Sequence, residues 1–187
     1  MTTPPLPPLP CPGGASRRRA EILRVDHAGE LGAVYIYRGQ RAVMGVAAGR
    51  EAIAGQLAEM EAHEARHLAR FETLLTASRV RPTLLAPLWR AAGFALGAGT
   101  ALMGEKAAHA CTEAVESVIE AHYAGQIAEL GEREPGLAAE LAVFRDEELA
   151  HRDQAVAAGA RQARGYPILA GVIAAGCRAA IALSEKL

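Results

Sequence analysis

Two short segments decide the fold: Glu64-Ala-Arg-His67 and Glu148-Leu-Ala-His151. In an α-helix an offset of three residues turns the chain by about 300°, so the Glu and His of each segment lie on one face. Apolar residues share these faces, namely Leu57, Met60, Leu68 and Phe71 in the first case and Leu141, Phe144 and Ala155 in the second. Both pairs are therefore predicted to point into the interior of a helical protein.

Each pair is preceded by one further Glu on an apolar helical row. Glu30 lies 34 residues before Glu64, and Glu116 lies 32 residues before Glu148. A buried carboxylate is costly unless it is protonated, paired with a cation or bound to a metal. The chain thus has two similar halves, each with a helix carrying an inward Glu and then a helix carrying Glu-x-x-His. This arrangement is the known ligand set of ferritin-like di-iron and di-manganese bundles.

The donor types favour two particular metals. Four carboxylates and two imidazoles neutralise two divalent ions, and oxygen and nitrogen donors without thiolate suit iron, or else manganese, better than structural zinc. The competing interpretation is that these are surface side chains of ordinary amphipathic helices. Glu116 is the weakest candidate, because its row also holds His109, Glu113 and Glu120, as a solvated face would.

The composition favours helices throughout. Of the 21 acidic residues only three are Asp, and Glu fits helix interiors better than Asp does. Aromatic residues make up 4% of the chain against 51% hydrophobic residues, which predicts closely packed helices with small aliphatic side chains. A formal net charge of −1 argues against a nucleic-acid partner. Three widely spaced cysteines predict neither a disulfide framework nor a zinc-thiolate site.

The chain divides into a tail and one domain. Residues 1–15 are Pro-rich and are predicted to be a disordered tail that is neither a secretory signal nor a transit peptide. Residues 16–187 are predicted to form a single domain. Helices are expected at about 16–44, 50–77, 106–130, 135–160 and 168–186, with another in or after the apolar run 91–104.

Two uncharged runs, 91–104 and 165–177, stand out. As helices the longer would reach about 21 Å, which is short of a bilayer of about 30 Å. They are either buried helices or apolar surfaces that enter one leaflet, and their pairing favours membrane contact. Several arginines near the ends of the domain are candidates for contact with anionic headgroups, or else belong to solvated faces: Arg17, Arg18, Arg19, Arg24, Arg164 and Arg178.

A set of longer motifs extends from about Ile22 to the C-terminus. It comprises Leu23–Glu30 (LRVDHAGE), Arg79–Thr83 (RVRPT), Pro87–Trp89 (PLW), Gly93–Thr100 (GFALGAGT), Ala110–Thr112 (ACT) and Arg145–Glu148 (RDEE) with His151. With the Glu64/His67 pair, these motifs resemble the demethoxyubiquinone hydroxylases of coenzyme Q biosynthesis. The resemblance implies an all-α, ferritin-like four-helix bundle with short apolar membrane-interfacial helices. It also implies two iron ions per subunit at Glu30, Glu64, His67, Glu116, Glu148 and His151. Leu31 and the segment 105–109 depart from the family pattern, which bears on the fit of the substrate tail.

The resemblance implies that the protein is a monooxygenase. It would add one oxygen atom from dioxygen to the ring of a polyprenyl demethoxyubiquinone or its quinol, with NADH as reductant. The chain has no G-x-G-x-x-G motif after a strand, so the NADH site is unknown. The expected setting is the cytoplasmic face of a bacterial inner membrane, or else the matrix face of the mitochondrial inner membrane, with a lipid-binding partner protein. The alternatives are iron oxidation without an organic substrate, as in ferritin or rubrerythrin, and a metal-free helical protein of the membrane surface.

Four further residues are candidates for supporting roles. Tyr123 lies seven residues after Glu116, and the His122-Tyr123 pair is a candidate proton or electron relay, against the alternative of a tyrosine packed between helices. Metal-bound imidazoles need acceptors for their second ring nitrogens, and Asp26 and Asp146 are the candidates.

Overall fold

The computed structural model describes residues 14–187, with side chains from position 17 onward, and contains no strand in that range. Its helices are α1 (Gly14–Met44), α2 (Glu51–Ser78), α3 (Ala86–Leu102), α4 (Glu105–Leu130), α5 (Pro135–Ala157) and α6 (Tyr166–Lys186), with a 3₁₀ turn at Ala160–Gln162. The predicted all-α class is confirmed. The predicted disordered tail lies outside the described residues, apart from Gly14 and Ala15, which begin α1.

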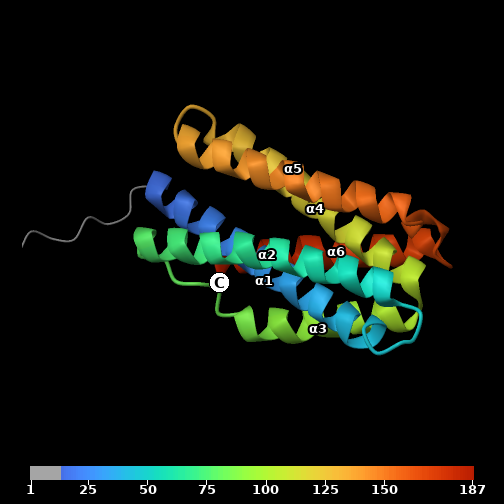
Figure 1. The fold of residues 1–187 in the computed structure, drawn as a ribbon. Coiled ribbons are helices and arrows are strands. Elements are labelled where there is room, and N and C mark those ends of the chain that lie inside the picture. The colour runs from blue at the N-terminus through green and yellow to red at the C-terminus, as the bar shows by residue number, and fades with distance from the viewer. Residues whose placement is uncertain (1–13) are drawn as a thin grey trace, which may run out of the picture.

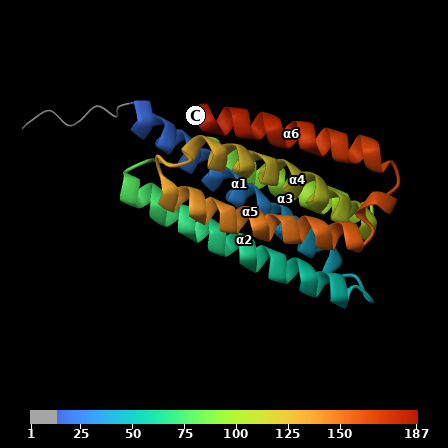
Figure 2. The same cartoon turned by 90° about the horizontal axis from the view of Figure 1, so that it is seen from above.

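Four long helices, α1, α2, α4 and α5, form the bundle, and α3 and α6 lie outside it (Figure 1). Within the bundle α1 packs along α2, and α4 packs along α5. The outer helix α3 packs on α1, while α6 covers α4 and α1 on the side that faces away from α2 and α5 (Figure 2). The predicted four-helix bundle with additional apolar helices is therefore confirmed.

Two of the apolar clusters lie toward opposite ends of the bundle, with a polar band between them. One cluster lies where α1 begins and α2 ends, and includes Ile22, Leu23, Phe71, Leu75 and Leu141. The other lies where α1 ends and α2 begins, and includes Met44, Ile53, Leu57, Met60 and Ala108. Since both clusters are buried, the side chains between them are screened from water at either end of the bundle.

Proline and glycine define two of the helix ends. Pro135 occupies the first turn of α5, where its missing N–H and fixed φ are tolerated. Gly104 joins α3 to α4 with φ of 113°, a conformation that L side chains rarely adopt. The chain can therefore turn between two helices with only two residues separating them.

Glycines let α3 approach α1 closely. A Cβ at Gly93 would lie 2.7 Å from the carbonyl oxygen of Gly32, and a Cβ at Gly97 would overlap the carbonyl oxygen of Ile36. In return, a Cβ at Gly39 on α1 would overlap the carbonyl oxygen of Phe94. The GFALGAGT motif therefore serves backbone-to-backbone packing between these two helices.

The second apolar run, 165–177, belongs to a helix that is longer than the run itself. The uncharged stretch ends at Arg178, but α6 continues through it to 21 residues, long and apolar enough by length and composition to cross a membrane. Length and composition alone are weak grounds for a membrane span. The alternative of a buried helix does not hold either, because Ile168 and Val172 of α6 are 76% and 66% exposed.

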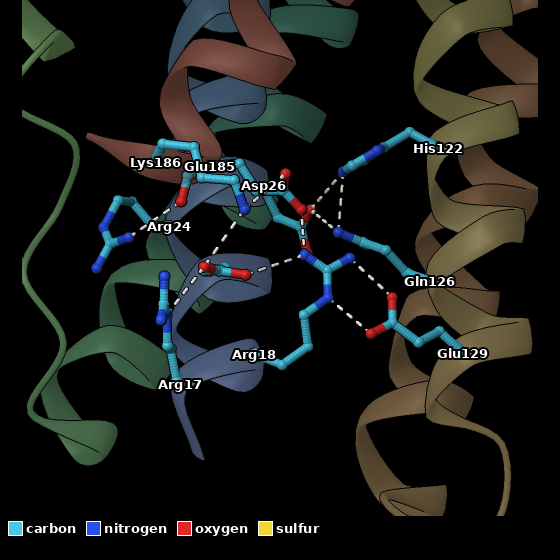
Figure 3. A network of polar contacts seen from close by, with 10 residues as sticks. Arg17, Arg18, Arg24, Asp26, His122, Gln126, Glu129, Glu185 and Lys186 are labelled. Carbon is cyan, nitrogen blue, oxygen red and sulfur yellow. Dashed lines mark hydrogen bonds and ion pairs between the residues drawn. The ribbon is translucent and has the colours of Figure 1, made fainter. Parts of the chain in front are cut away.

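The arginines near the start of α1 are engaged within the protein. Arg18 forms an ion pair with Glu129 on α4 at 2.7 Å and another with Glu185 on α6, while Arg19 pairs with Glu134. Figure 3 shows how Arg18 joins α1 to α4 and to the end of α6. These contacts favour a role in holding helix ends together over free attraction to headgroups.

Candidate metal centre

The structure brings all six predicted ligand residues together in the polar band of the bundle. Each of the four bundle helices supplies at least one: Glu30 from α1, Glu64 and His67 from α2, Glu116 from α4, and Glu148 and His151 from α5. All six are at most 5% exposed. The three-residue offset places Glu and His of α2 and of α5 on the inward face, as the helical geometry requires. Glu116 is therefore buried, and the solvated-face alternative for it is wrong.

Their donor atoms form two overlapping groups. One consists of Glu30, Glu64, His67 and Glu148, and the other of Glu64, Glu116, Glu148 and His151, with the donor atoms of each group within 4.8 Å of one another. Nδ1 of His67 lies 3.1 Å from Oε1 of Glu148, and Nδ1 of His151 lies 3.0 Å from Oε1 of Glu64. Because Glu64 and Glu148 belong to both groups, the geometry suits two neighbouring cations that share two carboxylates.

The donor atoms lack hydrogen-bond partners. Atoms in this state are Oε2 of Glu30, both carboxylate oxygens of Glu64 and of Glu148, Oε2 of Glu116, and Nδ1 of His67 and of His151. Buried polar atoms in proteins are nearly always hydrogen-bonded, because leaving one unsatisfied costs about 1–3 kcal/mol. A concentration of such atoms pointing at one another fits metal ions, and the oxygen-rich donor set fits iron or manganese.

The pKa values show the same need for a cation. Burial raises the pKa of Glu64 and of Glu116 well above the usual range, and the charge of Glu148 raises both further. Burial acts in the same direction on Glu148, but the nearby imidazoles of His151 and His67 outweigh it and lower its pKa to about 2. For His67 burial is outweighed by Glu148 and its neighbours, which raise the pKa to about 12. Without a metal the cluster therefore holds protons, which cations must displace.

The second nitrogens of both histidines have partners that the sequence did not single out. Nε2 of His67 contacts the carboxylate of Glu147, and Nε2 of His151 lies 3.1 Å from Nδ1 of His63. The predicted acceptors Asp26 and Asp146 are wrong. Asp26 contacts His122 and Gln126 instead, and Asp146 pairs with its neighbour Arg145 at the surface.

Two buried tyrosines donate hydrogen bonds to the carboxylates of the single-Glu helices. The hydroxyl of Tyr37 on α1 donates to Oε1 of Glu116 at 2.7 Å, and the hydroxyl of Tyr123 on α4 donates to Glu30. Each tyrosine lies seven residues after the Glu of its own helix. Tyr37 was missed as a site residue, although this spacing, already noted for Tyr123, also applies to it.

His122 belongs to a different network from its neighbour Tyr123. Its Nε2 lies 3.2 Å from Oδ1 of Asp26 and 2.9 Å from Nε2 of Gln126 (Figure 3). Asp26 is 3% exposed, and burial raises its pKa. Of the predicted relay pair, Tyr123 thus contacts the cluster directly, whereas His122 contacts a second buried acid.

An apolar cavity of about 380 Å³ adjoins the band between α1, α3, α4 and α6. Its lining includes Ala33, Ile36, Val115 and Ile119, of which Val115 directly precedes Glu116. It also includes residues of the outer helices, such as Trp89 and Val172. The cavity therefore lies between the bundle helices α1 and α4 and the two outer helices, and none of the six cluster residues lines it.

Comparison with known proteins agrees with this geometry. The sequence profile of the family described as "Ubiquinone biosynthesis protein COQ7" matches residues 17–184. The 3-demethoxyubiquinol 3-hydroxylase of Rhodospirillum rubrum is 53% identical over 182 residues, covering 97% of this chain and 83% of the relative. The human NADPH-dependent 3-demethoxyubiquinone 3-hydroxylase, mitochondrial, is 49% identical, and the Saccharomyces cerevisiae 5-demethoxyubiquinone hydroxylase, mitochondrial, is 41% identical. Each of these two matches covers 89% of this chain; the matched part is 76% of the human relative and 77% of the yeast relative. The chain belongs to the COQ7 family of ubiquinone biosynthesis proteins.

Proposed function

We propose that this protein hydroxylates the ring of a polyprenyl demethoxyubiquinone or its quinol with dioxygen. The single observation that carries the proposal is the buried six-residue cluster with its unpartnered donor atoms. The names of the relatives as demethoxyubiquinol and demethoxyubiquinone hydroxylases support the same reaction.

The six cluster residues are proposed to hold two iron ions. Glu30 and His67 would hold one ion and Glu116 and His151 the other, and Glu64 and Glu148, which belong to both groups, would supply donors to both. When bound, the iron pair supplies the activation of dioxygen. The apolar clusters on either side exclude water, and the hydroxyls of Tyr37 and Tyr123 hold Oε1 of Glu116 and of Glu30, which leaves Oε2 of each carboxylate without a partner.

The isoprenoid substrate is proposed to enter from a membrane surface. The cavity between α1, α3, α4 and α6 is apolar, and its lining includes both outer helices and Val115, the residue before Glu116. Exposed apolar residues lie on those outer helices, including Phe94 and Leu102 on α3 and Ile168 and Val172 on α6. This arrangement supports peripheral attachment to the membrane on which the quinone resides, in a bacterium or a mitochondrion. A lipid-binding partner protein would dock there only to assist delivery of the substrate.

The electron donor is proposed to be a reduced nicotinamide cofactor. NADH is the expected donor, whereas the name of the human relative specifies NADPH. No Rossmann fold lies among the described residues, which are helical, so the donor must bind a surface of the bundle or reduce the quinone itself. Paired assays with NADH and NADPH at equal concentration distinguish the two.

The test is hydroxylation by the iron-loaded protein in vesicles that contain demethoxyubiquinone, under ¹⁸O₂ and with each nicotinamide. Mass spectrometry should detect hydroxylated product with one ¹⁸O atom for each turnover. Consumption of dioxygen with oxidation of added iron but without this product would contradict the proposal and indicate iron oxidation alone. The matching variant Glu148→Gln should form no product.

A further inference from the structure

In each half of the cluster, the residue just before the Glu-x-x-His segment contacts the ligand histidine of the other half. On α5 this residue is Glu147, whose carboxylate contacts Nε2 of His67 on α2. On α2 it is His63, whose Nδ1 lies 3.1 Å from Nε2 of His151 on α5. In the tautomer that leaves Nδ1 of each ligand histidine free for a metal, both Nε2 atoms carry protons and donate across the bundle.

This pair of contacts is the place where the two halves differ chemically. The tyrosine contacts are alike, because the hydroxyls of Tyr37 and Tyr123 each donate a hydrogen bond to the single Glu of the opposite half. The contacts to the two ligand histidines are not alike. His67 contacts the carboxylate of Glu147, whereas His151 contacts a neutral imidazole nitrogen of His63. His67 is also stacked on Phe144, with ring centroids 4.3 Å apart, so its ring is held on a face as well as at its edge.

Resting on the metal centre proposed above, we infer that Glu147 and His63 are positioning residues that make the two metal positions unequal. A carboxylate that accepts the second N–H of a ligand imidazole makes the imidazole more basic and fixes its orientation. A neutral acceptor fixes the orientation but adds no negative charge. The position that contains His67 therefore binds its ion more tightly than the position that contains His151.

The consequence is stepwise filling of the centre. Loss of an outer partner of a ligand histidine typically weakens metal affinity by about 10- to 100-fold. The difference between a carboxylate and an imidazole partner should separate the two binding steps by about tenfold. One ion per chain would then occupy the His67 position before the second ion binds.

The experiment is a titration of the metal-free full-length protein with Co²⁺, followed by visible absorption and by calorimetry. The wild type should bind two ions in two resolved steps. Glu147→Gln should weaken the tighter step by about 10- to 100-fold and leave the other unchanged, whereas His63→Glu should tighten the weaker step. His63→Gln retains a neutral acceptor and should leave both steps in place.

A matched control is Glu140→Gln, which removes another carboxylate of α5, one that contacts Arg70 at the surface and no ligand histidine. The melting temperature of each metal-free variant checks that it is folded. Equal steps in the wild type, or an effect of Glu147→Gln no larger than that of Glu140→Gln, would overturn this inference and leave the metal centre standing. Binding of less than one ion per chain by the folded wild type would overturn the metal centre and this inference together.

Discussion

The four inner helices and the two outer helices distribute polarity in opposite ways. In the bundle of α1, α2, α4 and α5, carboxylates such as Glu64 and Glu148 are completely buried. On the outer helices α3 and α6, large apolar side chains such as Leu102 and Ile168 are each 76% exposed. An ordinary soluble domain buries the second kind of residue and exposes the first.

Both regions therefore depart from the usual distribution of polar and apolar side chains. Buried carboxylates are costly unless they are protonated, paired or bound to a cation, and the outer helices leave large apolar side chains in contact with solvent. An apolar cavity lies where the outer helices α3 and α6 pack against α1 and α4.

The largest effect on the inner region is expected from removing a carboxylate that belongs to both groups of donor atoms. Glu148→Ala takes away a donor from both groups and leaves the two histidines without their principal counter-charge. We expect iron content to fall below one ion per chain and hydroxylation to fall more than about a thousandfold, because a metal contributes several kcal/mol to such a reaction. Elemental analysis and product formation measure these effects.

The control for this prediction is Glu140→Ala on the same helix, which should retain both iron ions and activity. Activity of Glu148→Ala within tenfold of the wild type, in protein shown to lack iron, would contradict the assigned role.

The junction between inner and outer regions depends on glycine. Gly97→Ala places a methyl group against the backbone of Ile36, so α3 must move away from α1. Overpacking of this kind typically costs about 1–3 kcal/mol in the free energy of unfolding. Gly99→Ala, two residues away, meets no atom within 4 Å and should stabilise the helix by about 0.5–1 kcal/mol. Urea unfolding of the two variants should therefore show opposite signs, and equal signs would refute the packing role.

The outer region is tested by a pair of valines. Val172 on α6 is 66% exposed and Val143 on α5 is 56% exposed. If α6 rests on lipid, Val172→Ser should weaken binding to vesicles of phosphatidylcholine and phosphatidylglycerol by about tenfold, which corresponds to about 1.5 kcal/mol of apolar burial. Val143→Ser should leave vesicle binding unchanged. Flotation assays measure both, and equal losses would indicate nonspecific adsorption.

The inner region could be predicted from sequence because its signals are local. The Glu-x-x-His offset places both donors on one face of α2 and of α5, and the two-halves pattern adds Glu30 and Glu116. Proline and glycine similarly indicate the helix ends, which agree with the structure to within a few residues.

The contacts between helices could not be predicted from such local signals. The acceptors of His67 and His151 lie on the opposite helix, so nothing in their own segments distinguishes Glu147 from Asp146. The exposure of α6 also depends on which helices cover it, and an uncharged run looks the same whether it is buried or not.

Asp26 is a buried acid of the inner region that lies outside the metal cluster and contacts none of its six residues. Burial raises its pKa above the value of the unfolded chain, so the fold favours the protonated form. Its contribution to stability is fully present below the unfolded pKa of about 3.9 and is lost as pH rises through the folded pKa. Asp26→Asn removes this loss while its side-chain oxygen can still accept the hydrogen bond from Gln126.

The free energy of unfolding of Asp26→Asn should therefore match that of the wild type near pH 4 and exceed it increasingly at higher pH. The difference should grow by at most about 1.4 kcal/mol for each pH unit within the titration window. Asp146→Asn changes an exposed acid beside Arg145 and should show no such trend. A constant difference across pH would mean that Asp26 titrates alike in the folded and unfolded chain. In that case burial of a charged carboxylate would cost stability only within the metal cluster, where cations offset the charge. The polar network around His122 would then have a structural role only.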